Sequence, residues 1–145
     1  MNPADRNAVV DLLTELWFDI DHHGGPRAHT MFTDDGRLTF DARSFTGRDQ
    51  IRQVYLDRTS RGPRTSLHVV TNVRIHEVDD RAAQVTSIVS LYAADGGPPV
   101  SSTMPTCIAD VEDRVVKAGD EWLIASRRWR SLFRAADAVL AVPTR

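Results

Sequence analysis

The half of the chain after residue 63 constrains the fold most, because it is typical of β-strands throughout. Long runs rich in β-branched and aromatic residues alternate there with short polar or glycine-containing connections. Connections this short join antiparallel neighbours, whereas parallel strands need a long crossover. The sequence therefore predicts an antiparallel meander whose strands are residues 68–76, 82–93, 103–117 and 121–133.

The half before residue 63 predicts helices and a short hairpin. Apolar residues recur at helical spacing up to Gly24-Gly25, a pair typical of a helix end. Residues 33–36 are expected to form a polar turn. The expected helices are residues 3–23, a short one from Pro26 to Phe32, and residues 48–60, with a hairpin of residues 37–42 and 44–46 before the last helix.

Helices followed by a bent antiparallel sheet predict an α+β architecture in which the helices cover the concave face of the sheet. The 145 residues are enough for one domain with a core and a pocket for a small molecule. We expect that domain to span residues 1–134 and a C-terminal tail to span residues 135–145. The tail is either a short helix that packs on a neighbouring subunit or a loose end.

The composition argues against several classes of partner. The formal net charge is −2, and the arginines are dispersed among acidic residues, so neither nucleic acid nor an anionic membrane is an expected partner. Cys107 is the only cysteine, which excludes an internal disulfide and a thiolate metal cluster. No leader or long apolar run is apparent, and we expect a cytoplasmic protein.

Asp21 is the most informative single residue, because it stands where the apolar stripe of the first helix would normally continue with leucine. A carboxylate on a buried helix face needs a partner, and His68 at the start of a predicted strand is an obvious one. Alternatively, Asp21 pairs with an arginine or caps a loop, and His68 is an ordinary strand residue.

Five segments in this order resemble the SnoaL-like branch of the nuclear transport factor 2-like superfamily over residues 5–133. They are Phe18-Asp19-Ile20-Asp21, Met31-Phe32-Thr33-Asp34-Asp35-Gly36, Phe45-Thr46-Gly47-Arg48, His68-Val69-Val70-Thr71-Asn72 and Gly119-Asp120-Glu121-Trp122. The resemblance implies a cone-shaped α+β barrel with a strongly curved, mixed but mainly antiparallel sheet. It also implies a homo-oligomer, either a dimer or a trimer.

In several enzymes of this superfamily, including scytalone dehydratase, an aspartate on the first helix holds a histidine on the first long strand. Those residues match Asp21 and His68 here. Hexachlorocyclohexane dehydrochlorinase has a cationic residue one turn before the aspartate, where this chain has Leu16, so dehalogenation is not expected. The superfamily also contains ketosteroid isomerases, polyketide cyclases and members without activity, so the reaction must be argued from the site.

The expected chemistry is general acid–base catalysis without a metal or an organic cofactor. A histidine removes protons efficiently near neutral pH, and a carboxylate on its far nitrogen stabilises the imidazolium. We therefore predict a lyase, isomerase or cyclase in which Asp21 orients His68. Its substrate is expected to be a small hydrophobic molecule, polyketide-like or steroid-like.

Strand alternation places Arg127 and Trp129 on one face of the last run and Arg128 and Arg130 on the other. Tryptophan favours the interior, so Arg127 would face inward and, like Tyr55, could stabilise an oxygen that gains charge. The alternative is that all these arginines are solvated. The residues expected to contact substrate are Trp17, Tyr55, Asn72, Met104, Arg127 and Trp129.

Asn72 is expected on the same strand face as His68, where it binds substrate or holds a loop or helix end. A rival to the enzyme is a non-catalytic ligand-binding or subunit-docking module of the same fold. A third possibility is epoxide hydrolysis by an aspartate-activated water, for which Asp110 and Asn72 are the available polar residues.

Overall fold

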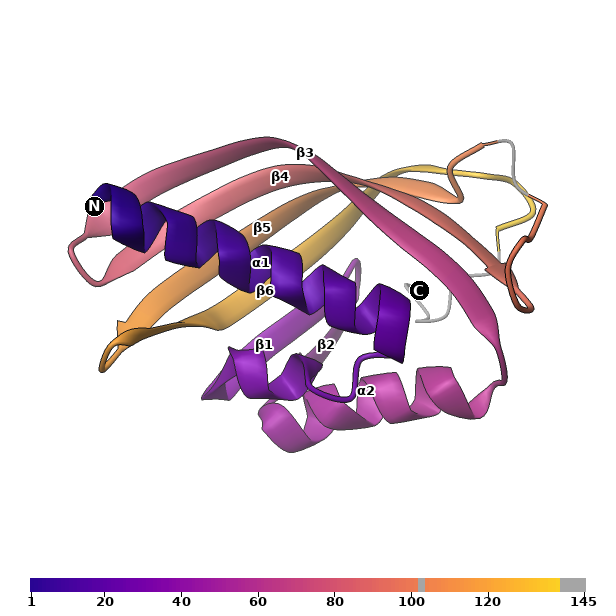
Figure 1. Cartoon of the computed structure of the whole chain (residues 1–145), viewed down its shortest axis with the longest axis horizontal. Coiled ribbons are helices and arrows are strands. Elements are labelled where there is room, and N and C mark those ends of the chain that lie inside the picture. Colours follow the sequence, from indigo (N-terminus) through magenta and orange to yellow (C-terminus); the bar gives the residue numbers. More distant parts are fainter. Residues whose placement is uncertain (102–103, 139–145) are drawn as a thin grey trace.

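The computed structural model describes residues 1–101 and 104–138 and has the predicted α+β architecture. A curled sheet of long strands wraps around one long helix, and a second helix lies beside the end of that helix (Figure 1). The elements are α1 (Pro3–His23), the 3₁₀ helix η1 (Ala28–Met31), β1 (Phe32–Phe40), β2 (Arg43–Thr46), α2 (Arg48–Ser60), β3 (Arg64–Asp79), β4 (Ala82–Asp95), β5 (Cys107–Ala118) and β6 (Glu121–Arg134).

The sheet has six strands in the order β2-β1-β6-β5-β4-β3. Strands β3 to β6 form the predicted antiparallel meander, and β1 and β2 form the predicted hairpin. Because β1 runs parallel to β6, the sheet is mixed. The sheet curls without closing, since β2 and β3 are its two edges.

Local signals define the ends of α1. The Asn2 side chain accepts a hydrogen bond from the backbone N–H of Asp5 at 2.8 Å and so caps the first turn. Gly24 ends the helix at φ +82°, a left-handed conformation that glycine adopts without strain. Gly25 follows at φ +81°, and a Cβ there would lie 2.8 Å from the ring of Tyr55, so the chain also needs a glycine for this close approach.

The predicted turn at residues 33–36 is wrong, because these residues belong to β1. Pairing between β1 and β6 is interrupted between Phe32 and Arg37, so this segment forms an irregularity within a continuing strand. Gly36 is buried, and a Cβ there would lie 2.9 Å from the Cβ of Phe32. Polar residues and a glycine thus mark a bulge here, which local composition does not distinguish from a turn.

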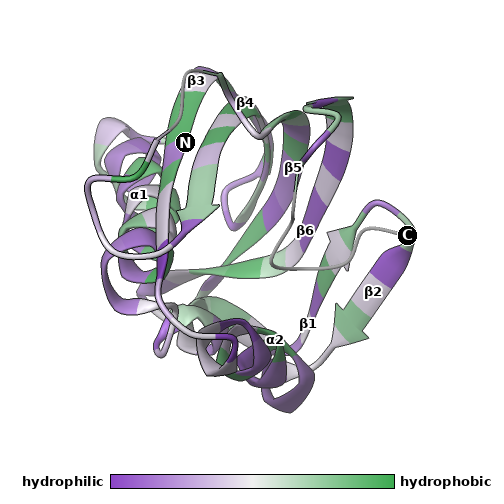
Figure 2. Ribbon diagram, turned by 90° about the vertical axis from the view of Figure 1, so that its right-hand side faces the viewer, coloured by the Kyte–Doolittle hydropathy of each residue, from purple (hydrophilic) through white to green (hydrophobic). Residues whose placement is uncertain are grey.

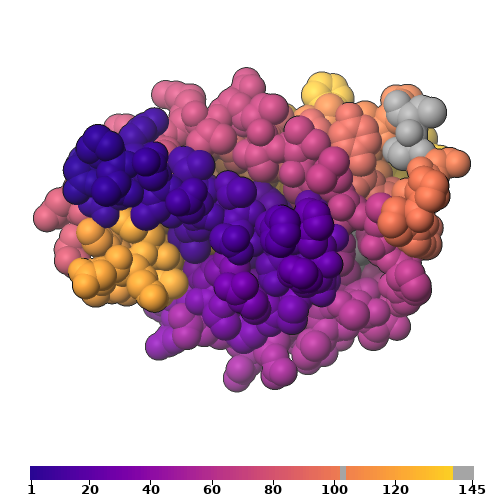
Figure 3. All heavy atoms as spheres, in the orientation of Figure 1, coloured from indigo at the N-terminus to yellow at the C-terminus, as the bar shows by residue number. Residues whose placement is uncertain are grey.

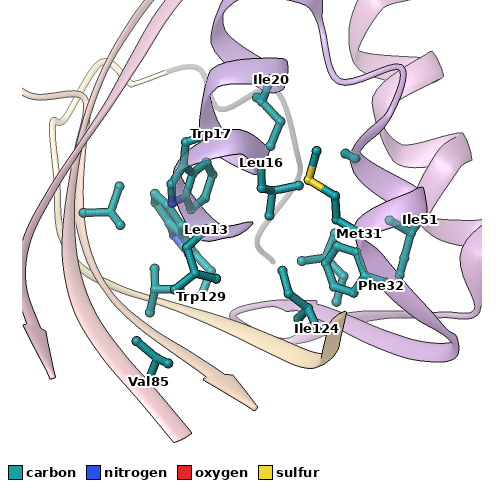
Figure 4. Packing of buried hydrophobic residues seen from close by; sticks show 14 of the residues in the cluster. Leu13, Leu16, Trp17, Ile20, Met31, Phe32, Ile51, Val85, Ile124 and Trp129 are labelled. Carbon is teal, nitrogen blue, oxygen red and sulfur yellow. The ribbon is translucent and has the colours of Figure 1, made fainter. Parts of the chain in front are cut away.

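The core lies between α1 and the concave face of the sheet. Leu16 projects from α1 towards Phe32 of β1 and Ile124 of β6, and Leu13 lies beside Trp129 of β6 (Figure 4). Apolar and polar residues alternate along the long strands, as expected for a sheet with one covered face (Figure 2).

The start of α1 is fixed to the hairpin of β5 and β6. The Asp5 carboxylate accepts hydrogen bonds from Lys117 Nζ at 2.8 Å and Trp122 Nε1 at 2.9 Å. In the space-filling view, α1 lies between β3 on one side and this hairpin on the other (Figure 3). One face of α1 therefore remains on the molecular surface while the other covers the sheet.

None of the helices within the described ranges is long and apolar enough to cross a membrane. Most of the predicted tail, residues 135–145, lies outside the described residues.

Candidate active site

Asp21 and His68 are in direct contact, as the sequence predicted. The Asp21 carboxylate lies at the end of α1, and its Oδ1 is 2.7 Å from Nδ1 of the His68 ring. Its Oδ2 accepts the backbone N–H of His68 at 2.8 Å, and the Ser66 hydroxyl donates to Oδ1 at 2.8 Å. One carboxylate therefore holds both the ring and the backbone of the same histidine, which leaves the ring little freedom to rotate.

The pair is enclosed by aromatic rings. Only 4% of the Asp21 side chain and 9% of the His68 side chain are exposed. Trp17, one helical turn before Asp21, stacks on the imidazole with ring centroids 4.2 Å apart and an interplanar angle of 16°. Trp129 of β6 meets the same imidazole edge-on at 6.1 Å. The predicted inward positions of Trp17 and Trp129 are thus confirmed.

Burial sets the protonation of the pair. Burial lowers the pKa of His68 below its ordinary value, and the contact with Asp21 opposes only part of this effect. Burial alone would raise the pKa of Asp21, but hydrogen bonds from His68 and Ser66 lower it. Near neutral pH the site therefore holds a neutral imidazole beside an ionised carboxylate.

This arrangement assigns the tautomer of His68. An ionised carboxylate can only accept hydrogen bonds, so Nδ1 must carry the ring proton and donate it towards Asp21. The lone pair of Nε2 then points away from the carboxylate. Nε2 forms no hydrogen bond with any residue of the described ranges, which leaves it available to accept a proton.

Arg127 faces inward as predicted, and it has a partner that the sequence analysis missed. Its Nε and Nη2 donate to the two carboxylate oxygens of Asp113 at 2.6 and 2.9 Å. The exposed fractions are 2% for Arg127 and 0% for Asp113. The guanidinium also lies 4.4 Å from the centroid of the Trp17 ring, so Trp17 contacts both Arg127 and His68.

Asp113 could have been found from alternation on β5. Its neighbours at period two, Val111 and Val115, are buried, so a carboxylate between them needs a buried cation. The missing information was the register, which places Asp113 directly opposite Arg127. A bulge between Ile124 and Ser126 of β6 also shifts the alternation.

That bulge decides which arginines face the core. Ile124 and Arg127 are both buried although they are three residues apart, which a regular strand does not allow. Beyond the bulge the predicted alternation holds, because Arg127 and Trp129 are buried while Arg128 and Arg130 are exposed.

Tyr55 lies on the inward face of α2 and is 5% exposed. Burial raises the pKa of its hydroxyl to about 12, with an opposing contribution from the charge of Arg127, so the hydroxyl stays protonated at neutral pH. In the described part of the chain, no hydrogen-bond partner engages this hydroxyl. Tyr55 therefore retains a donor for a ligand.

The expectation for Asn72 is wrong in its geometry. Asn72 adopts φ +53° where the β3–β4 register shifts between Thr71 and Arg74, and its side chain is exposed. The bulge ends the period-two alternation that would have placed Asn72 beside His68. Asn72 is therefore outside the enclosure around the imidazole.

Two further expectations differ from the structure. Met104 is 67% exposed and lies before β5, in a surface hollow with Thr106 and Ala93. Asp110 is on the outer face of β5, where it pairs with Arg130. Met104 precedes β5, because the predicted strand at residues 103–117 begins only at Cys107. Asp110 alternates with the buried positions Ala109 and Val111.

A narrow cleft opens between α1 and β3 beside Trp17. Its volume is about 40 Å³, far below the roughly 300–1,000 Å³ of pockets that hold drug-sized ligands. Arg127 lines it, and the Nη1 of this guanidinium is buried without a hydrogen-bond partner. The cleft therefore has room only for a small group, such as a water.

The described residues contain no group of three or more histidine, cysteine or acidic side chains with metal-binding geometry.

Comparison with solved structures supports the fold. A protein of unknown function from Mycobacterium tuberculosis superposes with a TM-score of 0.79 at 23% identity, covering 97% of this chain and 84% of that one. A protein from Novosphingobium aromaticivorans, described as a candidate scytalone dehydratase, has a TM-score of 0.78 at 19% identity, with 90% and 85% covered. ActVI-ORFA from Streptomyces coelicolor has a TM-score of 0.75 at 18% identity, with 89% and 98% covered.

No sequence of a curated protein matches this chain. The SnoaL-like domain family matches residues 3–128, which is most of the chain and includes both members of the Asp21–His68 pair. The likeness that the five sequence segments suggested is therefore confirmed, and the protein belongs to the SnoaL-like domain family.

Proposed function

We propose that the protein is a cofactor-independent lyase, isomerase or cyclase in which His68 is the general base. The observation that carries this proposal is the 2.7 Å contact between Asp21 Oδ1 and His68 Nδ1, together with an Nε2 that the described residues leave unengaged. Geometry and protonation agree, since a neutral imidazole beside an ionised carboxylate can accept a proton and be stabilised once charged.

The proposed step is removal of a proton from carbon. Nε2 of His68 forms the new N–H bond, and the electron pair of the broken C–H bond moves onto the oxygen of an adjacent carbonyl. The resulting imidazolium donates through Nδ1 to Asp21, which offsets its charge. In an isomerisation the imidazolium returns the proton to another carbon, and in an elimination it protonates the leaving oxygen.

Two side chains are suited to stabilise the oxygen that gains charge. The charge of Arg127 is largely matched by Asp113, but its buried Nη1 still has a proton to donate. Tyr55 has a protonated hydroxyl that the described residues leave free. We assign the oxygen to one of these two donors.

The aromatic surroundings support a small hydrophobic substrate. Trp17 and Trp129 contact the imidazole, and Phe40 lies against Trp129 with ring centroids 6.4 Å apart. The lining is chemically suited to a polyketide-like or steroid-like ring system, and a substrate of that size requires the 40 Å³ cleft beside Trp17 to widen on binding. Assembly into a homo-oligomer and a cytoplasmic location stay predictions from the sequence.

The test is proton exchange at carbon. Hydroxylated aromatic and cyclic ketones in deuterated buffer would be screened for enzyme-dependent loss of α-protons by NMR. We expect His68→Ala to reduce exchange by about 10²–10⁴-fold, the range for loss of a general base. His76→Ala is the matched control, since His76 is an exposed histidine on the same strand.

Retention of wild-type exchange in folded His68→Ala would disprove the mechanism. The alternative is a non-catalytic ligand-binding or subunit-docking module, which the same aromatic enclosure would also suit. Ligands that raise the melting temperature of the wild type and of Asp21→Asn equally, without proton exchange, would favour that alternative.

A further inference from the structure

A chain of hydrogen bonds runs from the Asp21–His68 pair to an arginine on α2. Nη2 of Arg58 lies 2.8 Å from the Ser66 hydroxyl, and that hydroxyl lies 2.8 Å from Oδ1 of Asp21. Ser66 is 8% exposed and stands on β3, two residues before His68. Three elements, α2, β3 and α1, thus meet at the carboxylate.

The direction of each hydrogen bond in this chain is determined by chemistry. An arginine has only donors, so the Ser66 oxygen must accept from Arg58. The single hydroxyl proton of Ser66 is then directed to Asp21, which as a carboxylate can only accept. Ser66 therefore accepts from Arg58 and donates to Asp21 at the same time, an arrangement that matches an ionised Asp21.

The charges around the Asp21–His68 pair have the same effect as the directions of the hydrogen bonds. Three charged groups influence the pKa of His68: Asp21 of α1, Arg58 of α2 and Arg127 of β6. Arg127 is neutralised by Asp113, to which it donates two hydrogen bonds, whereas no carboxylate of the described ranges forms an ion pair with Arg58. Tyr55 of α2 also lies near Arg58 and is uncharged at neutral pH. Arg58 is therefore a cation beside the pair whose charge interacts with Asp21 through space and through Ser66.

We propose that Arg58 and Ser66 are positioning residues that keep Asp21 an ionised acceptor and so hold His68 with its proton on Nδ1 and its lone pair on Nε2. The purpose of this positioning role rests on the proposed function. The tautomer that the role implies for His68 can be tested without a substrate. Neither residue needs to touch the substrate for this role. Arg58 acts through Ser66, and Ser66 acts through Asp21.

The test is ¹⁵N NMR of the His68 ring, which reports both the tautomer and the titration. In the wild type we expect the Nδ1–H tautomer. In Ser66→Ala, the carboxylate loses a donor and becomes a stronger base, so the titration midpoint of His68 should move up. In Arg58→Gln, loss of the cation should also move it up, because the Arg58 charge disfavours the imidazolium.

Two further variants separate this role from general effects of charge or packing. Arg58→Lys keeps the cation and should stay close to the wild-type titration. Arg52→Gln removes the same charge from an exposed position of α2 and should leave the His68 titration unchanged. An Nε2–H tautomer in the wild type, or an unchanged titration in both Ser66→Ala and Arg58→Gln, would overturn the proposal.

The proposed function would fail differently. Absence of proton exchange with a correctly assigned tautomer would reject catalysis and leave the positioning role intact. A reversed tautomer would reject the positioning role whatever activity is measured.

Discussion

Two buried carboxylates in this protein each hold a nitrogen base, and they differ in what that base can do. Asp113 binds Arg127 through both oxygens, at 2.6 and 2.9 Å, and a guanidinium never releases its proton at physiological pH. One oxygen of Asp21 binds Nδ1 of the His68 ring at 2.7 Å, and the other accepts the backbone N–H of His68 at 2.8 Å. The imidazole can exchange a proton through its second nitrogen.

Trp17 links the two pairs, because it stacks on His68 and lies against Arg127. Burial of a carboxylate therefore does not by itself indicate catalysis. The partner of the carboxylate decides its role. A permanently charged arginine forms a structural ion pair, whereas a titratable histidine is a candidate for proton transfer. Substitutions in the two pairs should therefore differ in their effects on stability and on the titration of His68.

Asp113→Asn should be the most destabilising of these changes. It leaves the 2% exposed Arg127 with a buried charge and no carboxylate, which costs about 3–5 kcal/mol of unfolding free energy. Urea denaturation measures the loss. The double variant Asp113→Leu with Arg127→Met should recover most of it, and a double variant as unstable as the single one would show that the charge is not the cause.

Asp21→Asn should cost less, about 1–3 kcal/mol, because the neutral imidazole left behind needs no counter-charge. The pKa of His68 should fall, since the Asp21 contact is what opposes the effect of burial. NMR titration of the imidazole measures this shift. If the pKa of His68 stays at its wild-type value, the two residues are not coupled in solution.

The pH dependence of stability should carry the signature of His68. Because burial lowers its pKa in the folded state, the unfolded chain binds the proton first as pH falls below about 6.5, the ordinary value for histidine. The free energy of unfolding should therefore decrease on acidification from that pH down to the folded pKa. Asp21, whose pKa is also lowered, adds a second loss as pH falls below 3.8 through its folded pKa.

Unfolding curves at several pH values test this dependence. His68→Gln should lack the decrease between pH 6.5 and the folded pKa, whereas His76→Gln, which changes an exposed histidine, should retain it. Equal slopes in both variants would assign the dependence to other groups.

Asp110→Asn should have the smallest effect. Asp110 pairs with Arg130 on the outer sheet face, where both side chains are partly exposed, at 38% and 58%. Such pairs contribute at most about 1 kcal/mol, and the contribution falls with added salt. The His68 titration should not change, and a clear change would mean that the outer face influences the site.

Much of the fold was predictable because its signals are local. The end of α1 before Gly24, the bounds of α2 and the meander of β3 to β6 follow from periodicity and turn residues. The parallel pairing of β1 with β6 does not. A partner for Asp21 was also predictable, because a carboxylate on an apolar stripe requires one whatever the fold. The family resemblance then favoured His68 over an arginine.

The failures have a common physical cause. Asn72 lies at a β-bulge, residues 33–36 continue a strand instead of turning, and Met104 precedes the strand that was expected to contain it. Each depends on which residues pair across the sheet, and pairing involves segments far apart in the chain. The period-two alternation of a strand predicts the sheet face of each side chain only as far as the next bulge, because a bulge shifts the alternation.

By itself the sequence determined the helices, the meander, the family resemblance and the need of Asp21 for a partner, because these depend on neighbouring residues and on the cost of burying a charge. Only the tertiary structure decided that Asp113 neutralises Arg127 and that Arg58 reaches Asp21 through Ser66. Strand register and helix packing bring those groups together, and neither is encoded in the local pattern of the chain.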